Sequence, residues 1–251
     1  SPEKNTSRFP AYLQELLHFD GIAAISEASK EEIIKYWQWL GIKNVPVIET
    51  IPLAVDMSQN RQIPESASSK VKKRTILCVG SIEGRKNQVS LLNAAEILWK
   101  KGHDFQLNLL GLANPETSSS TLALLRKLKQ DGRPIRWLGP KSEEDLRNQY
   151  VACYFTVYPS LTEGFGLPVL ESLKLGKPCI CSSTGAIGEI SNQGGCLTVE
   201  KPTPEALAGA MEKLLSDPST HAELCDETRG RVFRTWSDYA MDILEFHKSL
   251  R

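Results

Sequence analysis

The chain has 251 residues, and its 30 lysines and arginines equal its 30 acidic residues, so its formal net charge is zero. The balanced charge gives no support for a nucleic-acid partner, and a composition of 41% hydrophobic and 24% charged residues is that of a globular rather than a disordered protein. The charge-free stretches, such as residues 150–162, are far shorter than the roughly 20 residues that a membrane-spanning helix needs.

The start of the chain and the cysteines both predict an intracellular protein. The first residues are polar and lack the apolar run of a secretory signal, which predicts a cytoplasmic location, with peripheral attachment at the inner face of the cell membrane left open. No C-x-x-C pair occurs, so we expect reduced thiols and no metal site. The cysteines are Cys78, Cys153, Cys179, Cys181, Cys196 and Cys225.

The first part of the chain predicts one helix followed by one strand. Residues 22–25 are expected to be extended, and residues 29–32 (SKEE) to form a capping box that starts a helix ending at Leu40. A strand is expected at residues 45–48. Residues 61–73, rich in Ser, Lys, Pro and Glu, predict an exposed connection.

From about residue 70 to residue 235, short apolar runs alternate with amphipathic segments of helical length. This alternation predicts a parallel sheet with helices on both faces, which is a doubly wound, Rossmann-like α/β domain. Strands are expected at residues 75–79, 105–110, 135–138, 154–158 and 178–181. Helices are expected at residues 87–101, 122–129 and 167–175, after a capping box at 142–145, and near 205–215, 219–232 and 236–250.

The first candidate ligand loop is residues 80–87 (GSIEGRKN), after the first strand of this sheet. Ligands of open parallel sheets bind outside the carboxyl ends of the strands. Gly80 and Gly84 allow a tight turn, and Arg85 and Lys86 place two cations before a helix, which suits phosphate groups. The spacing differs from a Walker A loop, where a hydroxyl residue stands in place of Asn87. On spacing alone, a solvated basic turn explains these residues equally well.

The second candidate loop is residues 163–171 (EGFGLPVLE), after the strand at 154–158. Gly164 and Gly166 leave backbone amides free at the start of a helix, which is a site for anions. Glu163 and Glu171 offer carboxylates to the vicinal hydroxyls of a sugar or a ribose. The third glycine of a dinucleotide fingerprint is absent. Without further information, a capping acid and a surface acid also explain the two glutamates.

Glu163 and Glu171 bracket seven residues, and this stretch resembles the E-x7-E motif of retaining GT-B glycosyltransferases of family GT4 (glycosyltransferases group 1). Further motifs occur in the order of that family: VGSIEGRKN at 79–87, WLG at 137–139, YPS at 158–160, GKP at 176–178 and GEI at 188–190. Residues 24–27 (AISE) and 51–56 (IPLAVD) resemble the end of the preceding domain and the crossing between domains. The resemblance implies the C-terminal, donor-binding half of a GT-B fold with a fragment of the N-terminal domain.

The resemblance also implies roles for single residues. Lys86 matches the lysine that contacts the donor diphosphate, and Arg85 would replace the partner arginine, whose usual place holds Ser81. Glu163 would face the transferred sugar and Glu171 the ribose. The implied catalytic residues are therefore Glu163, Lys86 and Arg85. The implied donor-binding residues are Gly80, Ser81, Arg85, Lys86, Arg136, Trp137, Leu138, Glu163, Gly164, Phe165, Gly166, Leu167 and Glu171, with the base near residues 136–138 and the amides of residues 165–167 at the sugar and phosphates.

The function implied by the resemblance is metal-independent, retaining transfer of a hexose from a UDP- or GDP-sugar, with UDP slightly favoured, in polysaccharide biosynthesis. No cofactor is expected. The chain has no Asp-x-Asp motif, which is the metal-binding motif of the other major glycosyltransferase fold. The acceptor would be a glycan or lipid-linked molecule held by the N-terminal domain.

Family members have two Rossmann domains, and a chain of this length can hold one of them with a part of the other. Residues 1–60 are expected to be the remnant of the acceptor domain, residues 61–235 the nucleotide-sugar domain, and residues 236–251 a helix that returns to the N-terminal domain. We expect such a fragment to be inactive alone. Alternatives are a non-catalytic nucleotide-sugar-binding subunit, a GT-B sugar-nucleotide epimerase, or a Rossmann oxidoreductase, whose G-x-G-x-x-G motif residues 80–86 do not match.

Overall fold

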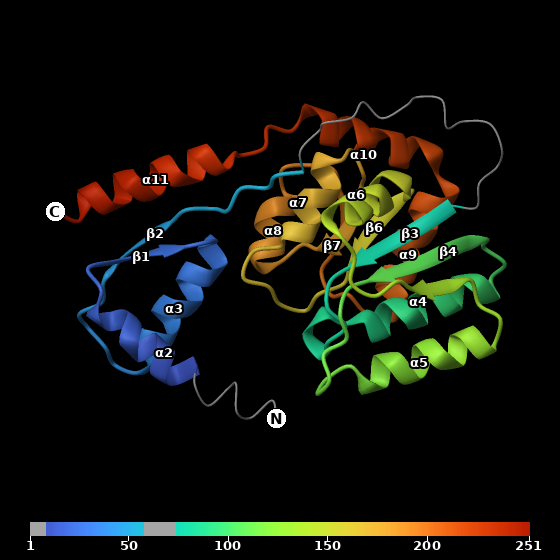
Figure 1. Ribbon diagram of the computed structural model, residues 1–251, viewed down its shortest axis with the longest axis horizontal. Helices are drawn as coiled ribbons and strands as arrows, with labels where there is room; N and C mark the ends of the chain where they lie inside the picture. The colour runs from blue at the N-terminus through green and yellow to red at the C-terminus, as the bar shows by residue number, and fades with distance from the viewer. Residues whose placement is uncertain (1–8, 58–73) are drawn as a thin grey trace.

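A computed structural model describes residues 9–57 and 74–251 of the chain (Figure 1). The expected connection at residues 61–73 and the expected domain boundary at residue 60 lie outside the described residues. Within the described part, an α/β domain carries most of the chain, and a smaller unit contains the first helices and strands together with the last helix.

The larger domain is built on a six-stranded parallel sheet, which confirms the predicted doubly wound fold. In the described residues its strands follow the order β5-β4-β3-β6-β7-β8. The chain therefore winds outward in one direction from β3 and then in the other from β6, so the switch point lies between these two strands. The strands are β3 (Arg74–Val79), β4 (Phe105–Leu110), β5 (Ile135–Trp137), β6 (Phe155–Tyr158), β7 (Cys179–Ser182) and β8 (Cys196–Val199).

Helices cover both faces of the sheet, and each face has its own apolar core. Successive side chains of a strand point to opposite faces, so Ile76 and Cys78 pack in one core and Leu77 in the other. The first core is closed by α4 (Gln88–Lys100), α5 (Ser119–Gln130), α9 (Pro204–Ser216) and α10 (Pro218–Gly230), and the second by α6 (Glu143–Ala152), α7 (Leu167–Lys174) and α8 (Gly185–Ser191).

Of the two capping boxes expected from sequence, one position is confirmed and one is wrong. Ser142 caps α6 through its side chain, as predicted, and Thr203 caps α9 in the same way. The predicted capping box at residues 29–32 is wrong, because α3 (Glu27–Trp39) begins one turn earlier. Ser26 is the cap: its backbone is extended, and its hydroxyl accepts a hydrogen bond of 3.1 Å from the amide of Ser29.

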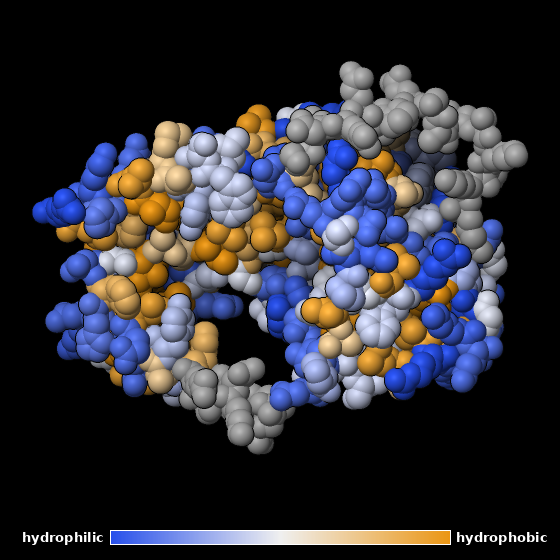
Figure 2. Space-filling model, viewed as in Figure 1, coloured by the Kyte–Doolittle hydropathy of each residue, from blue (hydrophilic) through white to orange (hydrophobic). Residues whose placement is uncertain are grey.

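The smaller unit contains a two-stranded parallel sheet of β1 (Gly21–Ala24) and β2 (Val47–Thr50), with α2 (Phe9–Glu15), the 3-10 turn η1 (Leu16–His18) and α3. The expected strand at 45–48 thus lies two residues later. The last helix, α11 (Trp236–Ser249), lies against β1 so closely that a Cβ on Gly21 would come within 2.8 Å of Phe246. Apolar side chains of α11 are exposed, as the surface of Figure 2 shows over this part of the molecule. No helix among residues 9–57 and 74–251 has the length and hydrophobicity to cross a bilayer.

Candidate functional site

The candidate site lies at the switch point of the sheet, where the loops after β3 and β6 meet. The loop after β3 ends in the 3-10 turn η2 (Gly84–Lys86) before α4 begins, and the loop after β6 leads into α7. The two loops are joined by a backbone hydrogen bond of 2.9 Å from Leu161 N to Arg85 O. This is the position at which open α/β sheets bind their ligands.

Asn87 fixes the first loop against its neighbours. Its backbone is left-handed, with φ of 54°, a conformation that asparagine tolerates better than most residues. Its side-chain amide donates to the carbonyl oxygens of Pro159, at 3.2 Å, and Pro202, at 2.9 Å. The sharp turn and these two anchors direct the side chain of Lys86 toward the second loop.

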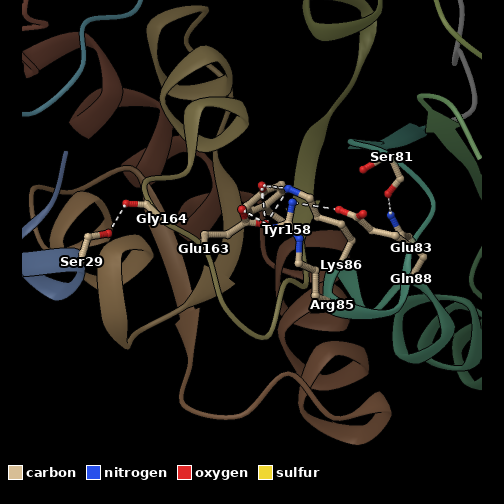
Figure 3. Close-up of polar contacts among 9 residues, drawn as sticks. All are labelled: Ser29, Ser81, Glu83, Arg85, Lys86, Gln88, Tyr158, Glu163 and Gly164. Carbon is tan, nitrogen blue, oxygen red and sulfur yellow. Dashed lines mark hydrogen bonds and ion pairs between the residues drawn. The ribbon is translucent and has the colours of Figure 1, made fainter. Parts of the chain in front are cut away.

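A cluster of charged groups joins the two loops (Figure 3). The Lys86 ammonium is buried and lies 2.6 Å from Glu163 Oε1 and 2.6 Å from the Tyr158 hydroxyl. Arg85 is half-exposed, and its guanidinium contacts Glu163 Oε2 at 2.8 Å and Glu83 Oε1 at 2.9 Å. Both oxygens of the Glu163 carboxylate are therefore bound by cations. We name Arg85, Lys86, Tyr158 and Glu163 the charged cluster.

Electrostatics fix the protonation of this cluster. Burial disfavours the Glu163 carboxylate, but the ion pairs with Lys86 and Arg85 outweigh burial and lower its pKa. Burial and the adjacent carboxylate raise the pKa of Tyr158 far above the physiological range. The phenol therefore stays neutral, with its single O–H donated to Glu163 Oε1 at 2.9 Å and its oxygen accepting from Lys86.

The start of α7 offers free backbone donors beside the cluster. Gly166 adopts φ of 119°, which favours glycine, and no side chain caps the helix. In the described part of the chain, the amides of Phe165, Gly166 and Leu167 have no hydrogen-bond acceptor. Free amides and the positive end of the helix together attract an anion.

Glu171, the second acid of the motif, lies one turn into α7 and is half-buried. Its Oε2 accepts a hydrogen bond of 2.7 Å from the hydroxyl of Tyr150, on α6. Burial raises the pKa of Glu171, and the Tyr150 hydrogen bond partly offsets that effect. The phenol thus holds the carboxylate in place. Burial removes water from this carboxylate, and a ligand hydroxyl that donates to it would replace part of the lost solvation.

The strand ends on the other side of the site come close to each other. The indole Nε1 of Trp137 donates to Gly111 O at 2.9 Å, and a Cβ on Gly111 would lie 2.2 Å from Gly80 O. Gly111 also has φ of 140°, so both space and conformation require glycine there. Arg136 and Trp137 are exposed and Leu138 is half-buried, so the edge strand β5 can border a ligand at this end of the sheet.

The structure brings Arg85, Lys86 and Glu163 together, although 77 residues separate Lys86 from Glu163. Among the described residues, Ser81 makes no hydrogen bond with the charged cluster; its carbonyl oxygen accepts from Gln88 Nε2 at 2.7 Å. Residues 136–138, at the edge strand β5, and Glu171, on α7, do not contact the cluster through any hydrogen bond found among the described residues. No group of three or more His, Cys, Asp or Glu side chains in that part of the chain is placed to hold a metal ion.

Tyr158, Tyr150 and Asn87 were given no role in the site from sequence, although Tyr158 and Asn87 lie in the motifs at 158–160 and 79–87. A tyrosine that ends an apolar strand or helix face has the pattern of a core residue, so this pattern assigned neither phenol to the site. A signal for Asn87 did exist, since asparagine after a glycine-containing turn is typical of left-handed backbone.

The smaller unit also reaches this site. The hydroxyls of Ser26 and Ser29 donate to Gly164 O at 2.8 and 3.2 Å (Ser29 in Figure 3). The carboxylate of Glu189, on α8, accepts from the amides of Glu27 and Ala28 at 3.1 and 2.7 Å. The N-terminus of α3 is therefore bound to the loop that carries Glu163.

Residues 59–231 match the protein family described as Glycosyl transferases group 1. Among curated proteins, the chain is 29% identical to O-antigen chain mannosyltransferase B of Escherichia coli, over 87% of the chain and 58% of that protein. It is 28% identical to the GDP-mannose-dependent monoacylated alpha-(1-6)-phosphatidylinositol monomannoside mannosyltransferase of Corynebacterium glutamicum, over 76% of the chain and 53% of that protein. The chain thus spans little more than half the length of these relatives.

Solved structures share the fold. HepE from Anabaena, in complex with UDP and glucose, superposes with a TM-score of 0.81 at 17% identity, over 99% of this chain and 69% of that one. Sucrose-phosphate synthase from Thermosynechococcus elongatus gives a TM-score of 0.79 at 23% identity, covering 98% and 62%. The C-terminal domain of a group 1 glycosyl transferase (LpcC) from Francisella tularensis gives 0.56 at 26% identity, covering 62% and 82%.

Proposed function

Because the chain belongs to the glycosyl transferases group 1 family, we propose that it forms the donor-binding part of a metal-independent, retaining glycosyltransferase. The donor is a UDP- or GDP-hexose and the acceptor a glycan or a lipid-linked sugar. The observation that carries the proposal is the charged cluster: at the switch point of the sheet, two cations contact the carboxylate of Glu163, and the free amides that begin α7 follow Glu163 in the same loop.

The diphosphate of the donor is bound by Lys86, Arg85 and the amides that begin α7. An ammonium has three N–H donors, and a guanidinium matches the oxygens of a phosphate in pairs. The amides of residues 165–167 add neutral donors whose positions are fixed by the backbone. Together these groups provide donors on two sides of a diphosphate without a metal ion.

The sugar and the ribose are bound by the two acids. In the free protein both oxygens of Glu163 are bound to Lys86 and Arg85, so a diphosphate competes with the carboxylate for the same cations. When the cations turn to phosphate, the oxygens of Glu163 become available to the hydroxyls of the sugar. Glu171 accepts from the ribose, and Trp137 borders the base.

Sugar transfer requires that the site stabilise the negative charge that develops on the leaving group when the anomeric bond breaks. The leaving nucleoside diphosphate gains negative charge, and fixed cations and amides stabilise it without reorganising at that moment. Residues 1–60 contribute the remnant of an acceptor domain, residues 61–235 the donor domain and residues 236–251 the returning helix. The full enzyme acts in the cytoplasm or at the inner face of the cell membrane, and the chain alone does not transfer sugar.

A thermal-shift panel of UDP, GDP, their hexose conjugates and the matching nucleosides tests the proposal. A ligand that binds only the folded state stabilises it by about 2.7 kcal/mol when its concentration is about 100 times its Kd. Either UDP and its sugar conjugates or GDP and its sugar conjugates should therefore raise the Tm, and the nucleosides should not. If no nucleoside diphosphate raises the Tm, the proposal is wrong. Incubating the chain with the bound nucleotide sugar and following the anomeric signals by NMR distinguishes an epimerase, which would interconvert the sugar without an acceptor.

A further inference from the structure

Each acid of the E-x7-E stretch has a buried tyrosine as a partner. Tyr158 is 3% exposed and lies 2.9 Å from Glu163 Oε1, and Tyr150 is fully buried and lies 2.7 Å from Glu171 Oε2. The two phenols come from different elements, β6 and α6. Because two phenols from different elements each donate a hydrogen bond to one of the two acids, we infer that they have the same kind of role.

We propose that Tyr158 and Tyr150 are positioning residues that hold the carboxylates of Glu163 and Glu171 in the orientation that receives the hydroxyls of the transferred sugar and of the ribose. This inference rests on the proposed function and deepens it. It assigns the specificity for sugar and for ribose to two residue pairs rather than to two single acids.

Tyr158 is suited to hold Glu163 during an exchange of partners. Glu163 lies in a loop, whereas Tyr158 lies on the central strand β6, where its ring packs in the second core. When Lys86 and Arg85 turn to a diphosphate, Glu163 loses its two ion pairs. The hydrogen bond from the phenol then remains, and it keeps one oxygen of the carboxylate in place.

The hydroxyl of Tyr150 contacts α7 at two places, one of which is Glu171. It donates to the carboxylate and lies 3.3 Å from the carbonyl oxygen of Pro168, in the first turn of α7. The carboxylate of Glu143 also acts on Glu171 and, like burial, disfavours its charged form. A hydrogen bond from a buried, neutral phenol opposes both effects and favours the ionised acid that a ribose requires.

A simpler interpretation is that both tyrosines only fill the second core, to which both rings belong. The two interpretations differ for a phenylalanine substitution, which keeps the ring and removes the hydroxyl. Under the core interpretation, Tyr158→Phe and Tyr150→Phe change stability but alter the binding of all ligands equally. Under our proposal, Tyr150→Phe changes only the discrimination between ribose and deoxyribose, and Tyr158→Phe changes only the discrimination between the sugar conjugate and the bare diphosphate.

The first experiment is calorimetry with three ligands of the base that the wild type binds: the nucleoside diphosphate, its 2′-deoxy analogue and its hexose conjugate. Tyr150→Phe should reduce the preference for ribose over deoxyribose by about tenfold, and Tyr158→Phe should reduce the preference for the conjugate over the bare diphosphate by about tenfold. Tyr154→Phe is the matched control, because that ring stacks on His221 on the other face of the sheet. Its ratios should equal those of the wild type. Unchanged ratios in the first two variants would overturn the proposal.

The second experiment needs no ligand. Carbon NMR of the glutamate carboxyls measures the pKa of Glu163 and Glu171 in each variant. Losing a hydrogen bond to the carboxylate raises the pKa of the acid, so Tyr158→Phe should raise only that of Glu163 and Tyr150→Phe only that of Glu171. If neither pKa moves, the positioning role is refuted. If both move as expected and the wild type binds no nucleoside diphosphate, the positioning role is supported and the proposed function fails.

Discussion

Replacing Lys86 with methionine separates the charge of this residue from its volume. The ammonium of Lys86 is the buried cation of the charged cluster, with Tyr158 and Glu163 as its partners. Methionine keeps an unbranched side chain of similar length and removes the ammonium. Arg85 still neutralises Glu163 in this variant, so we expect the domain to fold.

The expected loss of affinity follows from the exchange of partners. A hydrogen bond to a charged group contributes about 1.5–3 kcal/mol, and about 1.4 kcal/mol corresponds to tenfold in affinity, which gives a loss of roughly 10- to 150-fold. Because Lys86 must leave Glu163 before it binds phosphate, the net gain is smaller than for a free ammonium. We therefore expect Lys86→Met to weaken binding of UDP or GDP by about 10- to 30-fold.

Isothermal titration calorimetry with the nucleoside diphosphate and the uncharged nucleoside measures this effect. Only the diphosphate should lose affinity in Lys86→Met, because the nucleoside has no group for the ammonium to bind. Lys100→Met is the matched control, since Lys100 is exposed and pairs with Glu96 on the surface of α4. A diphosphate affinity within about twofold of the wild type would refute the role given to Lys86.

Three further predictions concern the site and its supports. The cations hold the pKa of Glu163 below its usual value of 4.5, so the stability that the ionised carboxylate provides is present above pH 4.5 and is lost as the pH falls through the lowered pKa. Calorimetry across pH should therefore show the largest Tm difference between wild type and Glu163→Gln at neutral pH and almost no difference in acid. Gly111→Ala places a Cβ against Gly80 O in a backbone strained by roughly 1–3 kcal/mol, so the Tm and the diphosphate affinity should both fall, the latter by at least about tenfold in calorimetric titrations. Glu189→Gln replaces a charge-assisted contact by a neutral one worth about 1 kcal/mol less, so hydrogen exchange at the amide of Ala28 should be about fivefold faster; an unchanged rate would show that α3 is held elsewhere.

The succession of strands and helices along the chain in the larger domain could be predicted because its inner strands, such as β6 and β7, are buried on both faces. Such strands give continuous apolar runs, as in residues 105–110, and glycine-containing loops mark their ends. The strand β8 was not predicted. This strand, Cys196–Val199, is short, and most of its residues are half-buried at the edge of the sheet, so its hydrophobic pattern is too weak to recognise.

The start of α3 was predicted about one turn too late, because contacts with distant elements support the cap at Ser26 over a cap at Ser29. Residues 29–32 have the pattern of a capping box, yet the helix extends back to Glu27. The carboxylate of Glu189, 162 residues away, satisfies the amide of Glu27, and Gly164 O accepts from the Ser26 hydroxyl. Tertiary contacts of this kind override a local signal.

The motif residues of the site could be identified from sequence, but their contacts could not. The sequence places Lys86 after the first strand and Glu163 after the fourth, and only the parallel order β3-β6 makes these loops neighbours. The hydrogen bonds of Tyr158 and Tyr150 could not be predicted for a different reason: a buried phenol contributes to a core and to a hydrogen bond at once, and sequence patterns report only the first. The donor-binding roles of all these residues stay predictions.

A crystal structure of the chain with the nucleoside diphosphate that raises its Tm tests the central claim most directly. We predict that the diphosphate lies between the Lys86 ammonium and the amides of Phe165, Gly166 and Leu167, with the ribose hydroxyls on Glu171 and the Lys86–Glu163 ion pair broken. A nucleotide bound at another place, with that ion pair intact at its length of 2.6 Å, would contradict the claim.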